Sequence, residues 1–248
     1  MIKIDEELEL AKQAALQAGL FLRQNQSEIS ITKESGRDIK LNADVQSQKI
    51  ILEVLENSAF EVLSEEKPET WVDHGIDYYW IVDPLDGSLN YSRHIPLCCI
   101  SIALWRENEP ILGVVYDLFN DDLYTGIVGT GAWCNEHSIH TSSIEEKNKA
   151  IICTGFPVYL SHETKDLNNF ILKIQGYKKT RLLGSAALSL AFVARGWADA
   201  YAEEAIAIWD VAAGIALVKA SGGIANYTFT KNIGNVFCDN GKIRSQLC

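Results

Sequence analysis

The sequence has too little positive charge for a protein that binds nucleic acid through its phosphate backbone. Its 248 residues include 22 Lys and Arg against 33 Asp and Glu, a formal net charge of −11. Affinity for nucleic acid comes mostly from Lys and Arg, so we expect no nucleic-acid polymer as a partner. A small phosphorylated ligand is not excluded by this charge balance.

Long apolar runs and paired cysteines are also lacking. No run approaches the roughly 18 apolar residues of a membrane span, and the segment Met1–Glu6 has no basic flank followed by an apolar core. The six cysteines form no C-x-x-C pair, which disfavours a zinc site or a disulfide framework. We therefore expect no membrane partner, reduced thiols and a cytoplasmic location.

Hydrophobic and charged residues, at 47% and 22%, have the shares of an ordinary globular protein. Apolar residues at helical spacing predict helices over 5–24 and 44–56. Short β-rich runs then predict strands at 60–63, 78–82, 100–105, 111–116, 123–128 and 132–134. After residue 148 the pattern alternates, with strands predicted at 150–154, 177–182 and 199–202 and helices at 162–175, 185–194 and 209–220. This order predicts an α+β half over 1–148 and an α/β half over 149–248, arranged as a layered sandwich.

The most informative segment is 80–90, where an apolar strand leads into two carboxylates, Asp83 and Asp86. The proline between them fixes one backbone angle, and Gly87 lets the backbone approach a ligand closely. If Ser88 opens a helix, free backbone N–H groups lie beside the carboxylates. Carboxylates can hold divalent cations and the N–H groups can hold a phosphate. An Asp-capped turn of the D-G type explains the same residues without any ligand.

Three other segments place carboxylates where strands end or helices begin. Glu65 and Glu66 follow an apolar strand, Asp210 starts an apolar helix, and Asp44 opens the helix predicted over 44–56. Each has a simpler explanation when taken alone. Surface acids account for the glutamate pair, and helix caps account for the two aspartates.

Considered together, these segments favour a shared metal site. Magnesium prefers oxygen ligands and is usually held by a few carboxylates with substrate phosphate. Without metal, so many acids at one point would repel one another and raise their own pKa values. Two or three ions could be held by Asp44, Glu65, Asp83, Asp86 and Asp210.

The order and separation of these motifs resemble the inositol monophosphatase family of magnesium-dependent, lithium-sensitive phosphatases. The signature stretches are 80–88 and 209–214, supported by 64–66 and 183–187, and the resemblance covers 33–223. It implies the α+β class with a five-layered α-β-α-β-α sandwich of the sugar phosphatase type. It also implies a homodimer and a cofactor of two or three Mg²⁺ ions.

The resemblance further implies roles for single residues. Glu65 and the Ser88 hydroxyl would orient a metal-bound water for in-line attack on phosphorus, and Asp44 would be linked to Ser88. The implied metal ligands are Glu65, Asp83, the Leu85 carbonyl, Asp86 and Asp210. The implied substrate-binding residues are Gly87, Ser88, Ser185, Ala186, Glu203 and Asp210.

The activity implied is hydrolysis of inositol monophosphate or a related polyol or sugar phosphate. The 3′(2′),5′-bisphosphate nucleotidases of the same superfamily also resemble the signature, but they usually follow D-G-T with Lys-Glu, whereas this chain has 89–91 as Leu-Asn-Tyr. Fructose-1,6-bisphosphatase and histidinol-phosphatase activity stay open. So does a cation-binding regulatory protein without turnover, because Leu41 and Ser88 stand where the family usually has Thr. Ser64 also departs from the family's commoner Gly.

Overall fold

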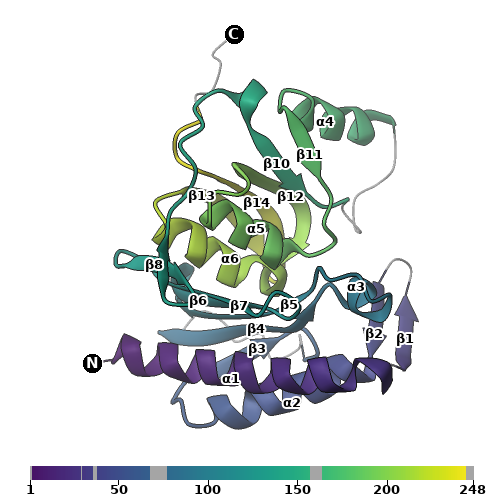
Figure 1. The fold of residues 1–248 in the computed structure, drawn as a ribbon, viewed down its shortest axis with the longest axis vertical. Coiled ribbons are helices and arrows are strands. Elements are labelled where there is room, and N and C mark those ends of the chain that lie inside the picture. Colours follow the sequence, from purple (N-terminus) through teal and green to yellow (C-terminus); the bar gives the residue numbers. More distant parts are fainter. Residues whose placement is uncertain (1, 29, 36–37, 68–76, 157–163, 244–248) are drawn as a thin grey trace.

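The computed structural model describes residues 2–28, 30–35, 38–67, 77–156 and 164–243. The elements stack in five layers (Figure 1). From one side to the other these are helices α1 (Ile4–Asn25) and α2 (Asn42–Leu55), a seven-stranded sheet, helices α5 (Ala186–Ala194) and α6 (Ile208–Ala220), a five-stranded sheet, and helix α4 (Thr164–Ile174). The predicted α-β-α-β-α sandwich is therefore confirmed.

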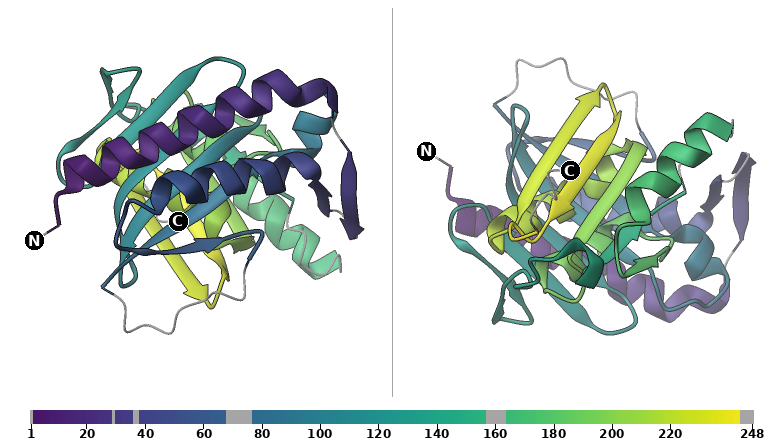
Figure 2. Two further views of the ribbon diagram at one scale, coloured as in Figure 1. Left: turned by 90° about the horizontal axis from the view of Figure 1, so that it is seen from below. Right: turned by 90° about the horizontal axis from the view of Figure 1, so that it is seen from above.

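Helices α1 and α2 lie side by side across the outer face of the first sheet (Figure 2, left). The helices predicted over 5–24 and 44–56 are confirmed. In α1, small residues at helical spacing, among them Ala11, Ala15 and Ala18, are buried on the side that faces the sheet. Gly19 belongs to this contact: a Cβ there would lie 2.3 Å from the Tyr116 ring. The tight contact fixes α1 on the sheet.

The first sheet has the order β3-β4-β5-β6-β7-β8-β9. β3 and β4 run parallel, and each later neighbour is antiparallel. Every strand predicted before residue 148 is found. The strand predicted at 78–82 is longer than expected and continues through Asp83 and Asp86. The strands are β3 (Glu61–Ser64), β4 (Tyr78–Asp86), β5 (Cys99–Arg106), β6 (Glu109–Asp117), β7 (Asp122–Ile127), β8 (Gly131–Cys134) and β9 (His137–Ile139).

The second sheet has the order β11-β10-β12-β14-β13. β10 is parallel to both of its neighbours, whereas β14 is antiparallel to β12 and β13. The three strands predicted after residue 148 are found, but the third continues to residue 207. The strands are β10 (Ile151–Thr154), β11 (Lys179–Arg181), β12 (Ala200–Ala207), β13 (Ile224–Thr230) and β14 (Ile233–Asp239).

Helices α5 and α6 form the central layer and are buried on nearly all sides. Sheets on both faces explain why their sequences are apolar throughout instead of amphipathic. Gly214 lets the two helices approach, since a Cβ there would lie 2.4 Å from the Leu190 Cβ atom. This packing aims the first turn of α6 at the end of β4 in the first sheet.

Five strands of the described chain were not predicted: β1 (Ile31–Ser35) and β2 (Asp38–Leu41), which form a hairpin, together with β9, β13 and β14. Polar residues lie among their apolar residues, and pairing with neighbouring strands stabilises them. Within the described part of the chain, no helix is long and apolar enough to cross a membrane.

Candidate metal and phosphate site

The parallel pairing of β3 and β4 brings two predicted segments to one edge of the first sheet. Ser64 pairs with Val82, and the Glu65 N–H donates to the Val82 carbonyl at 3.2 Å. Glu65 is thus held just past the end of β3, beside Asp83 of β4. Parallel strands end at the same edge, so two segments distant in sequence meet there.

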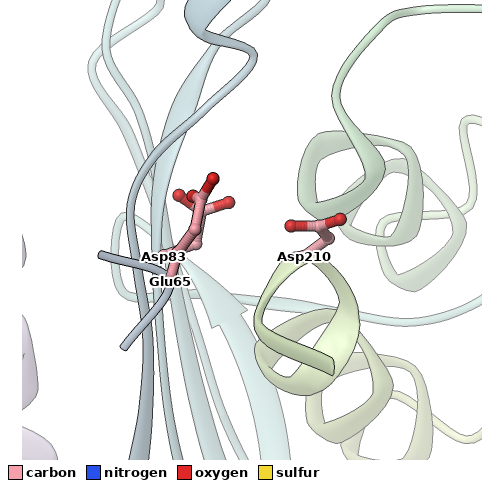
Figure 3. A group of neighbouring side chains, drawn as sticks. All are labelled: Glu65, Asp83 and Asp210. Atoms are coloured by element: carbon pink, nitrogen blue, oxygen red, sulfur yellow. The ribbon is translucent and has the colours of Figure 1, made fainter. Parts of the chain in front are cut away.

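Asp210 reaches this edge from the opposite side, on the first turn of α6 (Figure 3). Carboxylate oxygens of Glu65, Asp83 and Asp210 all lie within 4.8 Å of one another. Asp83 is only 1% exposed. Three carboxylates converging on one point form a donor set that suits a hard divalent cation.

The pKa values of these acids reflect the crowding. Burial, followed by the charges of Asp44 and Glu66, raises the pKa of Glu65 to about 8. Burial, followed by the charges of Glu65, Asp86 and Asp210, raises the pKa of Asp83 well above its usual value. A cation between these groups would remove both the repulsion and part of the desolvation penalty.

Asp86 joins the first sheet to the central helices. Its Oδ2 accepts hydrogen bonds from the Ser185 hydroxyl at 2.6 Å and the Ala187 N–H at 2.7 Å, at the first turn of α5. Burial nevertheless raises the pKa of Asp86 to about 6 against these donors. Ser185 is the N-cap of α5, because its Oγ also accepts from the Leu188 N–H at 3.2 Å.

Gly87 and Ser88 form the start of the short helix α3 (Ser88–Ser92), as the sequence predicts. Gly87 has a φ of 88°, and a Cβ there would lie 2.8 Å from the Leu97 carbonyl oxygen. Both the left-handed backbone and the close approach call for glycine. The turn therefore exposes the first backbone N–H groups of α3 beside Asp86.

The predicted link between Ser88 and Asp44 is present in the structure. The Ser88 Oγ lies 2.8 Å from Asp44 Oδ1 and 2.9 Å from the Leu85 carbonyl oxygen, so its one proton is shared between these two acceptors. Asp44 Oδ2 accepts from the Leu41 N–H at the start of α2. Burial raises the pKa of Asp44 to about 6. The Asp44 carboxylate thus caps the start of α2 with one oxygen and binds Ser88 of the candidate site with the other, two roles that the sequence presented as alternatives.

Sequence reasoning missed a set of polar side chains on the same face of α2. The Ser47 hydroxyl donates to the Pro84 carbonyl at 2.7 Å, and Gln48 accepts from the Ser64 hydroxyl at 2.5 Å. Both residues are buried, at positions three and four after Asp44. They brace the two strand ends that carry the acids. Polar residues three and four positions after Asp44, on the buried face of an apolar helix, could have indicated that these side chains support the site.

A neighbouring ion pair was also missed. Lys40 Nζ lies 3.0 Å from Glu66 Oε2, whereas Glu66 Oε1 is buried without a hydrogen-bond partner. Lys40 lies at the wall of the cavity described next. It supplies positive charge close to the acidic cluster.

Most of the predicted site residues line one cavity of about 620 Å³. Asp44 is absent from its lining and lies behind Ser88. Predicted residues lining the cavity are Glu65, Asp83, Leu85, Asp86, Gly87, Ser88, Ser185, Ala186, Glu203 and Asp210, and other lining residues include Lys40, Tyr201, Trp209 and Asn232.

Glu203 lies on β12, at the side of this cavity away from β3 and β4. The Tyr201 hydroxyl donates to its Oε2 at 2.8 Å, and burial raises the pKa of Glu203 to about 7. β12 has a register shift just after Glu203, where Ala205 adopts a φ of 53°. The irregular strand turns residues 205–207 into the wall of the cavity.

The chain is similar to known proteins in sequence and fold. A profile of the inositol monophosphatase family matches residues 3–243. The chain belongs to the inositol monophosphatase family. It is similar to an inositol-1-monophosphatase of Synechocystis sp., with 34% identity over 251 residues, 97% of this chain and 86% of that relative. It is also similar to a Nus factor SuhB of Escherichia coli (strain K12), with 31% identity over 240 residues, 91% of this chain and 89% of that relative.

The solved inositol monophosphatase of Anabaena (Nostoc) sp. PCC 7120 has the same fold. Its TM-score is 0.82 at 33% identity, covering 96% of this chain and 92% of that structure. Membership in the inositol monophosphatase family makes the protein a phosphoric monoester hydrolase.

Proposed function

We propose that this member of the inositol monophosphatase family is a Mg²⁺-dependent phosphomonoesterase that hydrolyses inositol monophosphate or a related polyol or sugar phosphate. The observation that supports this most is the convergence of Glu65, Asp83 and Asp210 beside the start of α3, within one cavity. Cation-binding carboxylates and phosphate-binding N–H groups then face the same space.

The donor set fits magnesium. The ligands we propose are carboxylate oxygens and one carbonyl oxygen, all hard donors. Their raised pKa values are what a site built around positive charge would have when it lacks that charge. We propose that two or three ions are held by Glu65, Asp83, the Leu85 carbonyl, Asp86 and Asp210.

The chain's own residues would orient the reactants. Bound divalent cations would supply Lewis-acid charge that lowers the pKa of water and balances the phosphate oxygens. Glu65 would accept a hydrogen bond from the attacking water. Ser88, whose proton points toward Asp44 and Leu85, presents oxygen lone pairs to the same water. The backbone N–H groups of Gly87 and Ser88 would bind phosphate oxygens.

The wall of the candidate catalytic cavity that contains Glu203, on the side away from β3 and β4, would bind the alcohol part of the substrate. We propose that the Glu203 carboxylate accepts a hydrogen bond from a sugar or polyol hydroxyl, with Asp210 and the loop at Ser185 and Ala186 completing the contact. With its pKa near 7, Glu203 would accept this bond best when ionised, at neutral pH and above.

The test is phosphate release from inositol 1-phosphate, glycerol 2-phosphate, adenosine 3′,5′-bisphosphate, fructose 1,6-bisphosphate and histidinol phosphate, with Mg²⁺ or with chelator. We expect release from the first two to exceed the others and to vanish with chelator, and Li⁺ to inhibit it. Preference for a bisphosphate or histidinol phosphate would replace the proposed substrate. Stabilisation by Mg²⁺ without any release would favour the non-catalytic, cation-binding function.

We also propose a homodimer in the cytoplasm. Leu89, Ile95 and Leu182 are exposed apolar side chains, and Asn90 Nδ2 ties their segments together by donating to the Leu97 and Leu183 carbonyls. Exposed apolar side chains on linked segments suit contact with a second copy of the chain. Light scattering should give twice the monomer mass for the protein and the monomer mass for Leu182→Glu. The five cysteines in the described ranges are buried free thiols, which supports a reducing location.

A further inference from the structure

A second cavity of about 610 Å³ lies between α4 and the outer face of the second sheet. We call it the apolar cavity, because its lining is mainly aliphatic and aromatic, with Phe156, Leu167, Phe170, Ile174, Val236 and Phe237 among its walls. Its size and lining are those of a small-molecule site. α4 lies toward one side of this sheet, and β13 and β14 are left uncovered beside it (Figure 2, right).

The apolar cavity adjoins the candidate catalytic cavity. Thr154, Gly155, Phe156 and Glu203 line both. The first three lie at the end of β10, and Glu203 lies on β12, the neighbouring parallel strand. The Thr154 hydroxyl donates to the Ala202 carbonyl at 2.6 Å and so joins the two strands at this point. The wall between the cavities is therefore a shared rim formed by the carboxyl end of β10 and the middle of β12.

Gly155 lets the backbone of the rim lie directly against the Glu203 carboxylate. A Cβ at Gly155 would lie 2.2 Å from both carboxylate oxygens of Glu203. Any other residue would push Glu203 from the place where we expect it to contact the substrate alcohol. A substrate that contacts Glu203 is therefore next to a residue that also lines the apolar cavity.

Aromatic side chains line the apolar cavity beside this rim. Phe156 and Phe170 form an edge-to-face pair with centroids 5.6 Å apart and an interplanar angle of 68°, and 41% of Phe156 is exposed. A third ring could add to this pair with favourable edge or stacked geometry. The ion pair of Lys173 with Glu204 joins α4 to β12, and both residues line the apolar cavity.

We propose that the apolar cavity binds the apolar part of the substrate's alcohol, so that this enzyme prefers phosphate monoesters whose alcohol carries an aromatic ring several bonds from the phosphate. The inference rests on the proposed function, since it assigns the substrate class of the same catalytic site. In the reaction, water supplies the oxygen that joins phosphorus, the P–O bond to the alcohol breaks, and the leaving alkoxide takes a proton from that water.

The experiment compares ethyl phosphate, 2-phenylethyl phosphate and 4-phenylbutyl phosphate, which all release a primary alkoxide and differ in apolar reach. We expect kcat/KM to rise by about tenfold or more from ethyl to 4-phenylbutyl phosphate, because a buried phenyl ring removes a large apolar area from water. Calorimetry with Mg²⁺ and the non-hydrolysable ethylphosphonate and 4-phenylbutylphosphonate should show the same preference in affinity without any turnover.

Substitutions in the lining of the apolar cavity test whether the preference for phenyl-bearing esters comes from that cavity. Phe170→Ala should abolish it and leave the rate with ethyl phosphate unchanged, while Ile171→Ala, an exposed neighbour on α4 outside the lining, should keep it. If Phe170→Ala does not fold, Thr228→Trp fills the cavity from an exposed position on β13, and Thr230→Trp is the matched control outside the lining on the same strand.

The outcomes separate the two proposals. Release of phosphate from inositol 1-phosphate and ethyl phosphate without any gain from the phenyl group overturns the inference and leaves the proposed function standing. Equal loss of the preference in the lining variant and its control also overturns it. Absence of release from every ester contradicts the proposed function, whereas selective binding of 4-phenylbutylphosphonate would still support the apolar cavity as a ligand site.

Discussion

Replacing Glu65 by Gln should stabilise the metal-free protein above neutral pH. The pKa of Glu65 rises from 4.5 to about 8, chiefly by burial. A carboxyl with a raised pKa holds its proton more tightly in the folded state, so the free energy of unfolding decreases as pH rises from about 4.5 to 8. Gln keeps the size of the side chain and removes the charge.

The magnitude follows from the pKa difference. Each pKa unit corresponds to about 1.36 kcal/mol, which gives an upper value of roughly 5 kcal/mol for Glu65 at pH 8.5. Its partial exposure and its hydrogen bond with Asp83 reduce this to about 2–3 kcal/mol. For a protein of this size, about 2–4 °C in Tm per kcal/mol converts the gain to roughly 4–12 °C.

The assay is thermal unfolding in chelator at pH 4.5, 6.5 and 8.5. Glu65→Gln should match the unsubstituted protein at pH 4.5 and exceed it increasingly at the two higher values. Added Mg²⁺ should raise the Tm of the unsubstituted protein and act little on the variant. Glu61→Gln, at an exposed carboxyl at the start of β3, the strand that leads to Glu65, is the control. A variant that is less stable than the unsubstituted protein at pH 8.5 in chelator would refute the reasoning.

Three further changes test other parts of the site. Gly87→Ala should lower stability by about 1–3 kcal/mol, because it adds a Cβ 2.8 Å from the Leu97 carbonyl at a left-handed φ, and chemical denaturation showing no loss would contradict this. Ser185→Ala should cost about 1–2 kcal/mol in the same assay, since it removes the cap of α5 and one donor to Asp86; an unchanged denaturation midpoint would count against both roles. Asp210→Ala should weaken Mg²⁺ binding at least tenfold in calorimetry, and unchanged affinity would remove Asp210 from the proposed ligand set.

Most of the fold could be predicted because local signals agreed with the final packing. Alanine spacing marked α1, and strands of β-branched and aromatic residues marked the middle of the first sheet. β13 was missed although its exposed and half-buried residues alternate, which is the pattern of a strand. The shorter strands β1, β2 and β9 depend on pairing that no single segment reveals. The division into halves at 1–148 and 149–248 stays a prediction, because α5 and α6 pack between both sheets.

The acids of the site could be predicted from their positions at strand ends and helix starts. The supporting residues could not. Ser47 and Gln48 act through the Pro84 carbonyl and the Ser64 hydroxyl, and these contacts exist only once α2 lies against β3 and β4. The sequence likewise gives no sign that the Asp86 carboxylate faces the first turn of α5.

The most direct test of the central claim is phosphate release from inositol 1-phosphate after chelation and return of Mg²⁺, compared between the unsubstituted protein and Asp83→Asn. Asp83 lies at the centre of the carboxylate cluster, and Asn preserves its shape. We predict no release in chelator, full recovery with Mg²⁺, and at least about a hundredfold lower rate in the variant. Release that persists in chelator, or equal rates for the two proteins, would contradict a carboxylate-held metal at the site of hydrolysis.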